Sequence, residues 1–157
     1  MVLGELADMV QMYLAVMEDV FAREEVARLR AQLPDATSVV ITSHRSPDGD
    51  AIGSSLALTH MLTGMGVSST VVMPDAYAKF LHWMPGQDTV RFHDAEPEAV
   101  SALVARADIL FCLDYNAPSR AGGLADAVKE ACANEKSTGV MVDHHQEPEP
   151  FADILLS

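Results

Sequence analysis

The 157-residue chain contains few cysteines and few positive charges. Its two cysteines, Cys112 and Cys132, do not form a CxxC pair, which argues against a thiolate zinc site and favours two reduced side chains. Lys and Arg number 10 against 23 Asp and Glu, so the formal net charge is −13. A field of that sign does not attract long duplex nucleic acid. A phosphate substrate would have to be held by bound cations or by a few local Arg and His residues.

Long apolar runs are also missing. No stretch approaches the length that crosses a bilayer, so we expect no membrane partner. The N-terminus mixes acidic with apolar residues and has no basic region, so it does not resemble a signal peptide. We therefore expect a soluble, cytoplasmic protein. Apolar residues make up 49% of the chain, which is enough for a core, and the length favours one domain over residues 1–157.

Residues 5–33 contain neither Gly nor Pro, and their apolar side chains recur at helical spacing. This pattern predicts one or two amphipathic helices within a helical N-terminal segment, residues 1–34. Methionines at this spacing belong to a core more often than to a partner-binding face. The apolar positions of the pattern are Leu6, Val10, Tyr13, Met17, Phe21, Leu29 and Leu33.

The rest of the chain alternates short apolar segments with helical patterns. Strands are predicted at 38–43, 67–73, 89–92, 109–113 and 139–142, and helices at 51–63, 97–107 and 124–134. A loop with a short helical turn, packed on the sheet edge, is predicted at 76–87. The alternation indicates a three-layer, Rossmann-like α/β domain, with a mostly parallel sheet of about five strands between helices.

Three of the predicted strands end in acidic residues. Asp48 and Asp50 follow the first strand, Asp114 follows the fourth, and Asp143 follows the fifth. Carboxyl ends of parallel strands share one edge of a sheet, so these side chains should converge. Imidazoles lie in the same loops, at His44, His144 and His145. We therefore predict one metal site.

Mixed imidazole and carboxylate ligands suit Mn²⁺, Fe²⁺, Co²⁺ or Zn²⁺ better than Ca²⁺. Two such ions, about 3.5–4 Å apart, need a bridging carboxylate, and Asp114 on the middle strand is the candidate. Gly49 is expected to turn the backbone tightly so that its acidic neighbours face one point. Small residues such as Ser54 at the start of the next helix leave room for a phosphate.

Each motif also has an ordinary structural explanation when it is taken alone. Asp48 and Asp50 could cap the following helix. His144 and His145 could be a surface pair, and Asp114 could be a turn residue. The occurrence of all three motifs at successive strand ends favours a shared site.

The segments SHRSPDGDAIGSSLAL, LDYNAPSR and VDHH resemble three motifs of the DHH phosphoesterase family. The first motif is most similar to the branch of nanoRNases and 3′-phosphoadenosine-5′-phosphate phosphatases. The resemblance implies a two-metal hydrolase that favours Mn²⁺. Its substrates would be short oligonucleotides, including dinucleotides, or 3′-phosphoadenosine-5′-phosphate.

The same resemblance implies roles for individual residues. The first ion would be bound by His44 and Asp48, the second by Asp50 and His144, and Asp114 would bridge them. His145 would contact the scissile phosphate and act in catalysis, and Asp143 would orient the histidine pair. Arg120 would bind a phosphate. Ser54 stays a substrate-binding candidate from its position at the helix start alone.

Members of this family carry a further metal-binding aspartate and a C-terminal substrate-binding domain. Because the printed chain ends at Ser157, the resemblance implies an incomplete catalytic domain. We expect a homodimer. Two alternatives stay open: hydrolysis of pyrophosphate or polyphosphate, and a non-catalytic module that binds metal or nucleotide.

Overall fold

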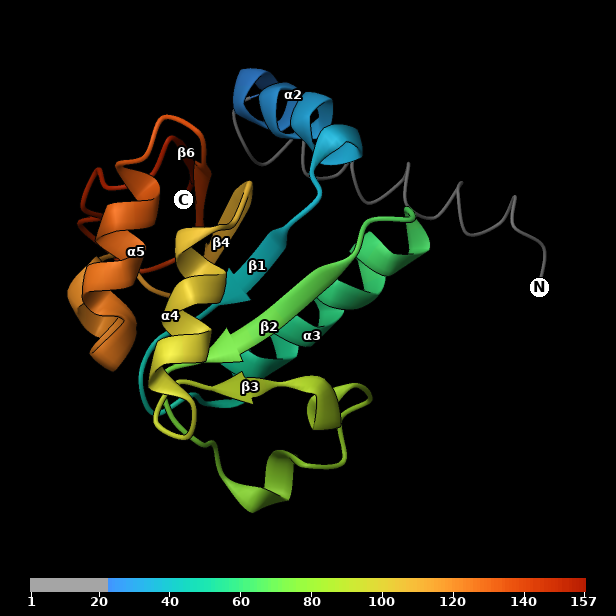
Figure 1. The fold of residues 1–157 in the computed structure, drawn as a ribbon, viewed down its shortest axis with the longest axis vertical. Coiled ribbons are helices and arrows are strands. Elements are labelled where there is room, and N and C mark those ends of the chain that lie inside the picture. The colour runs from blue at the N-terminus through green and yellow to red at the C-terminus, as the bar shows by residue number, and fades with distance from the viewer. Residues whose placement is uncertain (1–22) are drawn as a thin grey trace.

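The structure, a computed structural model, describes residues 23–157. Its centre is one six-stranded sheet in the order β3-β2-β1-β4-β5-β6, and every neighbouring pair is parallel (Figure 1). The strands are β1 (Val39–Thr42), β2 (Ser69–Met73), β3 (Arg91–Phe92), β4 (Ile109–Leu113), β5 (Thr138–Val142) and β6 (Ile154–Leu156).

Helices cover both faces of the sheet, as Figure 1 shows. The described α-helices are α2 (Arg23–Gln32), α3 (Gly49–Gly64), α4 (Pro97–Ala105) and α5 (Ala125–Cys132). Successive side chains of a strand point to opposite faces. In β1, Val39 and Ile41 join the core under α2 and α3, whereas Val40 joins the core under α4 and α5. The predicted three-layer α/β fold is therefore confirmed.

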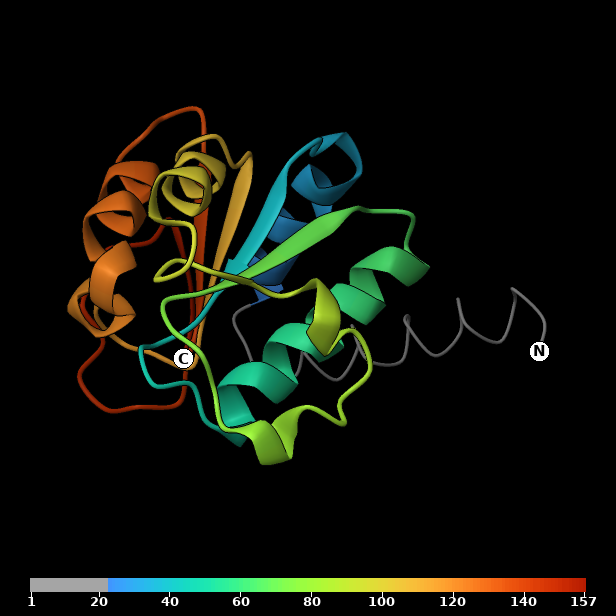
Figure 2. The ribbon, with the colours of Figure 1, turned by 60° about the horizontal axis from the view of Figure 1, so that its bottom comes forward.

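The strand order reverses next to β1, and this reversal positions the site. The chain first runs outward through β2 and β3, and then returns to the other side of β1 for β4, β5 and β6. Connections after β1 and β4 therefore leave the sheet in opposite directions (Figure 2). In open parallel sheets a crevice forms at such a reversal, outside the carboxyl ends of the strands.

Two details differ from the sequence prediction. The sheet gains a sixth strand, β6, which pairs with β5 through Val140 and Ile154. Three residues are too few to give a periodic signal, so this strand was not counted among the five. The prediction of a loop packed on the sheet edge at 76–87 is only partly right: Leu81 is buried in the short helix η2 (Lys79–Leu81), but Phe80 and Trp83 are exposed.

The predicted N-terminal helices meet the described chain only at α2. Leu29 in α2 and Leu33, the first residue of the short helix η1 (Leu33–Asp35), are buried, as the pattern predicts. The Arg28 side chain also donates a hydrogen bond to the Asp153 carbonyl, which ties α2 to the start of β6. The other positions of the pattern lie outside the described residues: Leu6, Val10, Tyr13, Met17 and Phe21. Within residues 23–157, none of the helices combines the length and apolar character needed to span a membrane.

Candidate metal centre

The loop after β1 begins with a buried imidazole. His44 is 9% exposed, and its Nδ1 donates to the carbonyl of Arg45 at 2.8 Å. That bond sets the tautomer and leaves Nε2 with a free lone pair, the form in which imidazole binds a metal. The preceding Ser43 hydroxyl donates to the Leu113 carbonyl at 2.7 Å, which holds this loop against the end of β4.

Asp48 caps helix α3. Its Oδ1 accepts hydrogen bonds from the backbone N–H groups of Asp50 at 3.0 Å and Ala51 at 3.1 Å. The bond from Ala51 is the largest cause of a lowered pKa at Asp48, and nearby His44 lowers it further. The same oxygen lies 3.8 Å from His44 Nε2. Asp48 therefore caps the helix and also faces the imidazole, so the two explanations offered by the sequence are compatible.

Gly49 does not make the tight turn that we predicted. It is the first residue of α3, its φ is not positive, and an added Cβ would meet nothing within 4 Å. The prediction was wrong because the cap at Asp48 already redirects the chain into the helix. Among the described non-glycine residues, positive φ occurs instead at Ser46 (53°), Asp114 (63°) and Glu147 (55°).

Asp114 lies at the centre of the site in a strained backbone conformation. It directly follows β4, its N–H donates to the Val142 carbonyl at 2.9 Å, and it is 8% exposed. A φ of 63° is left-handed, which costs free energy for a residue with a Cβ, although Asp tolerates it better than most. Such strain commonly accumulates at functional sites. Here it turns a carboxylate back over the sheet edge.

The two carboxylate oxygens of Asp114 face different histidines. Oδ2 lies 3.6 Å from His44 Nε2, and Oδ1 lies 3.3 Å from His144 Nε2. Two groups of possible metal ligands result, and Asp114 belongs to both. One group joins it to His44 and Asp48, the other to His144 and His145. Within each group the ligand atoms lie within 4.8 Å of one another, which is the spacing expected around an ion.

Asp143 holds the second histidine of the pair. Its side chain is buried, Oδ1 accepts from His145 Nδ1 at 2.6 Å, and Oδ2 accepts from the His145 backbone N–H at 3.0 Å. His145 Nδ1 is therefore engaged, and only Nε2 remains for another partner. The ring of His144 has no such bond from Asp143 and is more exposed than that of His145.

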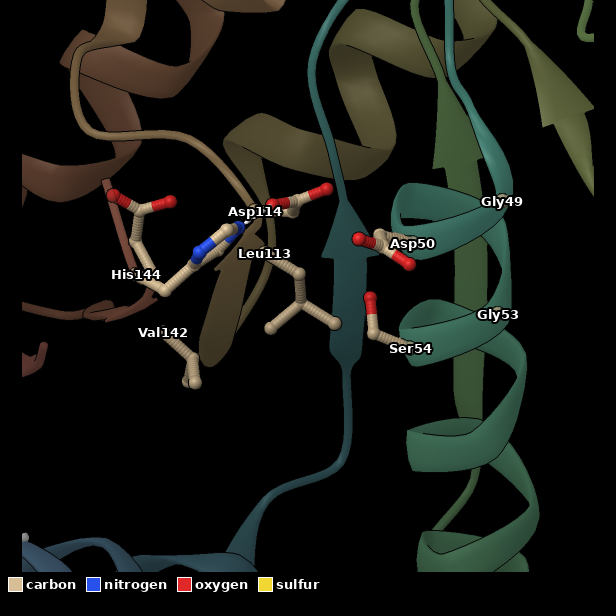
Figure 3. Close-up of a pocket in the computed structure, with 9 residues that line it drawn as sticks. Gly49, Asp50, Gly53, Ser54, Leu113, Asp114, Val142 and His144 are labelled. Carbon is tan, nitrogen blue, oxygen red and sulfur yellow. Dashed lines mark ion pairs between the residues drawn. The ribbon is translucent and has the colours of Figure 1, made fainter.

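A pocket of about 500 Å³ opens beside these residues (Figure 3). Asp50 and Ser54 face it from the first turns of α3, across from Asp114 and His144. Asp50 belongs to neither group of possible ligands, although it lines the pocket. The volume fits a small ligand of nucleotide size. The lining residues are Gly49, Asp50, Gly53, Ser54, Leu113, Asp114, Val142, Asp143 and His144.

Arg120 lies outside the residues that line this pocket. It belongs to the short helix η4 (Pro118–Leu124), and its carbonyl accepts from the Arg45 N–H at 2.8 Å. The predicted phosphate contact therefore stays a prediction. Sequence reasoning overlooked the apolar part of the pocket wall, Leu113 and Val142. The available signal was their position, because each is the last residue of a strand before an acidic one.

Comparisons with known proteins show the family of this chain and the solved structures that it resembles. Residues 38–156 match the family described as DHH family, N-terminal domain. An exopolyphosphatase-related protein from Bacteroides fragilis is similar in structure, with a TM-score of 0.81 and 38% identity. The match covers 87% of this chain and 39% of that one, so this chain spans about two fifths of its length.

A second solved structure shares the fold alone. It is an α-glucosyltransferase, in complex with UDP and a 13-mer DNA that contains an HMU base, with a TM-score of 0.56 and 16% identity. That match covers 76% of this chain and 37% of the transferase. No curated protein matches the chain.

Proposed function

The chain belongs to the DHH family, and from this premise we propose that it is a metal-dependent phosphoesterase. Its substrates would be short oligonucleotides, hydrolysed to 5′-mononucleotides, or 3′-phosphoadenosine-5′-phosphate, converted to AMP. The observation that carries the proposal is the position of Asp114, whose two oxygens belong to two neighbouring groups of possible metal ligands. A shared carboxylate of this kind would hold two ions close enough to act on one phosphate.

The donor set fits divalent ions of the Mn²⁺ type. His44, Asp48 and Asp114 would hold one ion, and Asp114 with His144 would hold the second. Asp50 would join the second group from the wall of the pocket. Bound there, two ions would neutralise phosphate charge and lower the pKa of a water molecule between them.

Residues around these metal ligands would bind the phosphates of the substrate and orient the His145 ring. Because Nδ1–H of His145 donates to Asp143, the ring direction is fixed and only Nε2 is left to face the substrate. When the ring carries its second proton, Nε2–H would donate a hydrogen bond to a phosphate oxygen. Ser54 would donate to a phosphate from the wall of the pocket. Arg120, six residues after Asp114, would bind a second phosphate with its planar fork.

Hydrolysis of pyrophosphate or polyphosphate is a second candidate. The similar protein from Bacteroides fragilis is described as exopolyphosphatase-related, and the two chains are 38% identical over 87% of this one. The metal-binding groups alone do not distinguish these substrates, because both present phosphate oxygens to the ions. The distinction must come from contacts to the rest of the substrate.

The test is a comparison of initial rates with Mn²⁺ on a 5′-phosphorylated dinucleotide, 3′-phosphoadenosine-5′-phosphate and pyrophosphate. We expect release of a mononucleotide or AMP that depends on Mn²⁺ and is lost in Asp114→Asn. The exposed Asp126→Asn is the matched control and should behave as wild type. Turnover of pyrophosphate alone would support the second candidate. Identical rates for wild type and Asp114→Asn on every substrate would rule out both.

A further inference from the structure

Two aromatic side chains project into solvent from the segment after β2. Phe80 is 76% exposed and Trp83 is 75% exposed. The next most exposed large apolar side chains of the described chain are Leu155 at 37% and Met65 at 36%. Exposed apolar surface of this kind commonly marks a site for a ligand or a partner.

The backbone that carries these two rings is held in place. Leu81 lies between Phe80 and Trp83 in the chain, and Tyr77 precedes both. Leu81 and Tyr77 are each 6% exposed and belong to the core under α3. The ring of Tyr77 contacts the ring of His82 edge-on, with centroids 5.3 Å apart. Phe80 and Trp83 therefore project from a fixed turn, which lowers the entropy cost of binding a flat ligand on them.

The segment that carries this turn leaves the sheet at the carboxyl edge, where the metal centre also lies. Asp75, just after β2, accepts a hydrogen bond from the Ser46 N–H at 2.6 Å, and Ser46 lies between His44 and Asp48 in the loop after β1. The segment with the aromatic pair therefore leaves the sheet beside the metal-ligand loop. Figure 2 shows the turn at Lys79–Leu81 beside the end of α3 that begins at Gly49, and in Figure 1 the same turn lies below β3.

The polar side chains beside the rings fit a phosphorylated ligand. The cationic Lys79 precedes Phe80, and the exposed imidazole of His82, which can donate a hydrogen bond, precedes Trp83. In the part of the chain that the structure describes, Lys79 has no carboxylate partner, although acidic residues outnumber basic ones by more than two to one. Exposed aromatic rings next to cationic side chains are the means by which proteins bind single-stranded nucleic acid, through base stacking and phosphate attraction.

We propose that Phe80 and Trp83 form a stacking surface for a nucleobase of the substrate, next to the phosphate held at the metal centre. This inference rests on the proposed function and narrows it, because inorganic polyphosphate has no base to stack. A second copy of the chain is the less favoured occupant. A stable interface buries about 800 Å² per partner, and the other exposed large apolar side chains of the described residues reach only half the exposure of this pair.

Trp83 reports on the proposal directly, because it is the single tryptophan of the chain. The experiment follows its fluorescence while the 157-residue protein is titrated with a 5′-phosphorylated adenosine dinucleotide. An abasic dinucleotide of equal charge and pyrophosphate are titrated in parallel, and calorimetry measures each affinity. We expect the adenosine dinucleotide alone to quench Trp83. Phe80→Ala should raise its Kd by about tenfold, the range measured for loss of one aromatic stacking partner.

Matched variants separate stacking from bulk apolar contact. Phe80→Leu keeps an apolar side chain but removes the ring, so it should weaken dinucleotide binding nearly as much as Phe80→Ala does. Met65→Ala removes an exposed apolar side chain just after the other end of α3 and should leave the Kd unchanged. Neither Phe80 variant should alter the affinity for pyrophosphate, since that ligand has no base.

Several results would overturn the proposal. One is a dinucleotide that binds without changing Trp83 emission, or with equal affinity in wild type and Phe80→Ala. Another is failure of the dinucleotide to bind at all. A third is emission that changes with protein concentration in the absence of ligand, which would assign the rings to a second copy. Hydrolysis of dinucleotide with an unchanged KM in Phe80→Ala would leave the phosphoesterase proposal standing and remove only the stacking surface.

Discussion

The carboxylate of Asp143 binds His145 at two points, accepting from its ring Nδ1 at 2.6 Å and from its backbone N–H at 3.0 Å. The carboxylate of Asp143 is buried at the sheet edge, so water competes only weakly for either hydrogen bond. This pairing fixes both the direction of the imidazole and its tautomer. It holds His145 more firmly than a solvated surface histidine would be held.

The first prediction concerns this pair. Asp143→Asn should lower kcat by about 10- to 100-fold, because loss of the acid leaves the imidazole poorly oriented and shifts its tautomer. KM should change less than kcat, since the phosphate-binding residues remain. Steady-state kinetics over a range of pH would check both values. Asp126→Asn is the control, and equal kcat values in Asp143→Asn and wild type would contradict the role given to Asp143.

The second prediction separates charge from backbone strain at Asp114. Asn tolerates the left-handed conformation that Asp114 adopts at φ 63°, whereas Ala does not. Asp114→Asn should therefore lower activity by on the order of a thousandfold while stability changes little. Asp114→Ala should lose the same activity and also about 1 kcal/mol or more of stability. Urea unfolding of both variants, beside activity measurements, gives the comparison.

The third prediction uses the double role of Asp48. Ser accepts hydrogen bonds as an N-cap but is a poor ligand for a divalent ion, so Asp48→Ser should keep stability near that of wild type and weaken Mn²⁺ binding. Asp48→Ala removes both roles and should cost about 1 kcal/mol in addition. Calorimetric Mn²⁺ titration and urea unfolding distinguish them. Wild-type Mn²⁺ affinity in Asp48→Ser would exclude Asp48 as a ligand.

The fourth prediction concerns the opposite edge of the sheet, where Asp108 joins β1 to β4. Its Oδ2 accepts from the Thr37 hydroxyl, the Thr37 N–H and the Ser38 N–H at 2.7 to 2.9 Å. The hydrogen bond from the Thr37 hydroxyl is the largest cause of a lowered pKa at Asp108. Asp108→Ala should cost about 1–2 kcal/mol at pH 7, with partial exposure keeping the value low.

The sign of the pH dependence follows from that lowered pKa. Folded Asp108 binds a proton less readily than unfolded Asp108 does, so the stabilisation is fully present above the ordinary pKa of about 3.9. It is lost as the pH falls through the lower, folded value. The stability difference between wild type and Asp108→Ala should therefore shrink below about pH 4. Urea unfolding at several pH values measures it, with the exposed Glu135→Ala as control. A difference that grows on acidification would be contrary to expectation.

Much of this fold is predictable because most of its strands are short and rich in apolar residues. The strand at Ile109–Leu113 was predicted at the residues where the structure places it, since five buried apolar residues end at a charged one. The sixth strand was not counted, because Ile154–Leu156 is held by pairing with β5 and by the side chain of Asp153, which accepts from Gly139 N–H at 2.8 Å. Such long-range pairing leaves little trace in the local sequence.

The gathering of site residues was predictable from topology, but their orientation was not. That Asp48, Asp114 and Asp143 reach one edge follows from their places at the ends of parallel strands. We predicted a tight turn at Gly49, but the chain changes direction at the Asp48 cap and Gly49 already begins the helix. Sequence alone does not separate a helix start from a tight loop. The positive φ of Asp114 and the buried bond between Asp143 and His145 depend on packing across strands, which local patterns do not encode.

The central claim is that one carboxylate, that of Asp114, serves two cation sites. Calorimetric titration with Mn²⁺, combined with electron paramagnetic resonance, tests it most directly. The account predicts two ions per wild-type chain with the magnetic coupling of a bridged pair, and loss of that coupling in Asp114→Asn. Binding of at most one ion by the wild type, or an uncoupled pair that Asp114→Asn leaves unchanged, would contradict it.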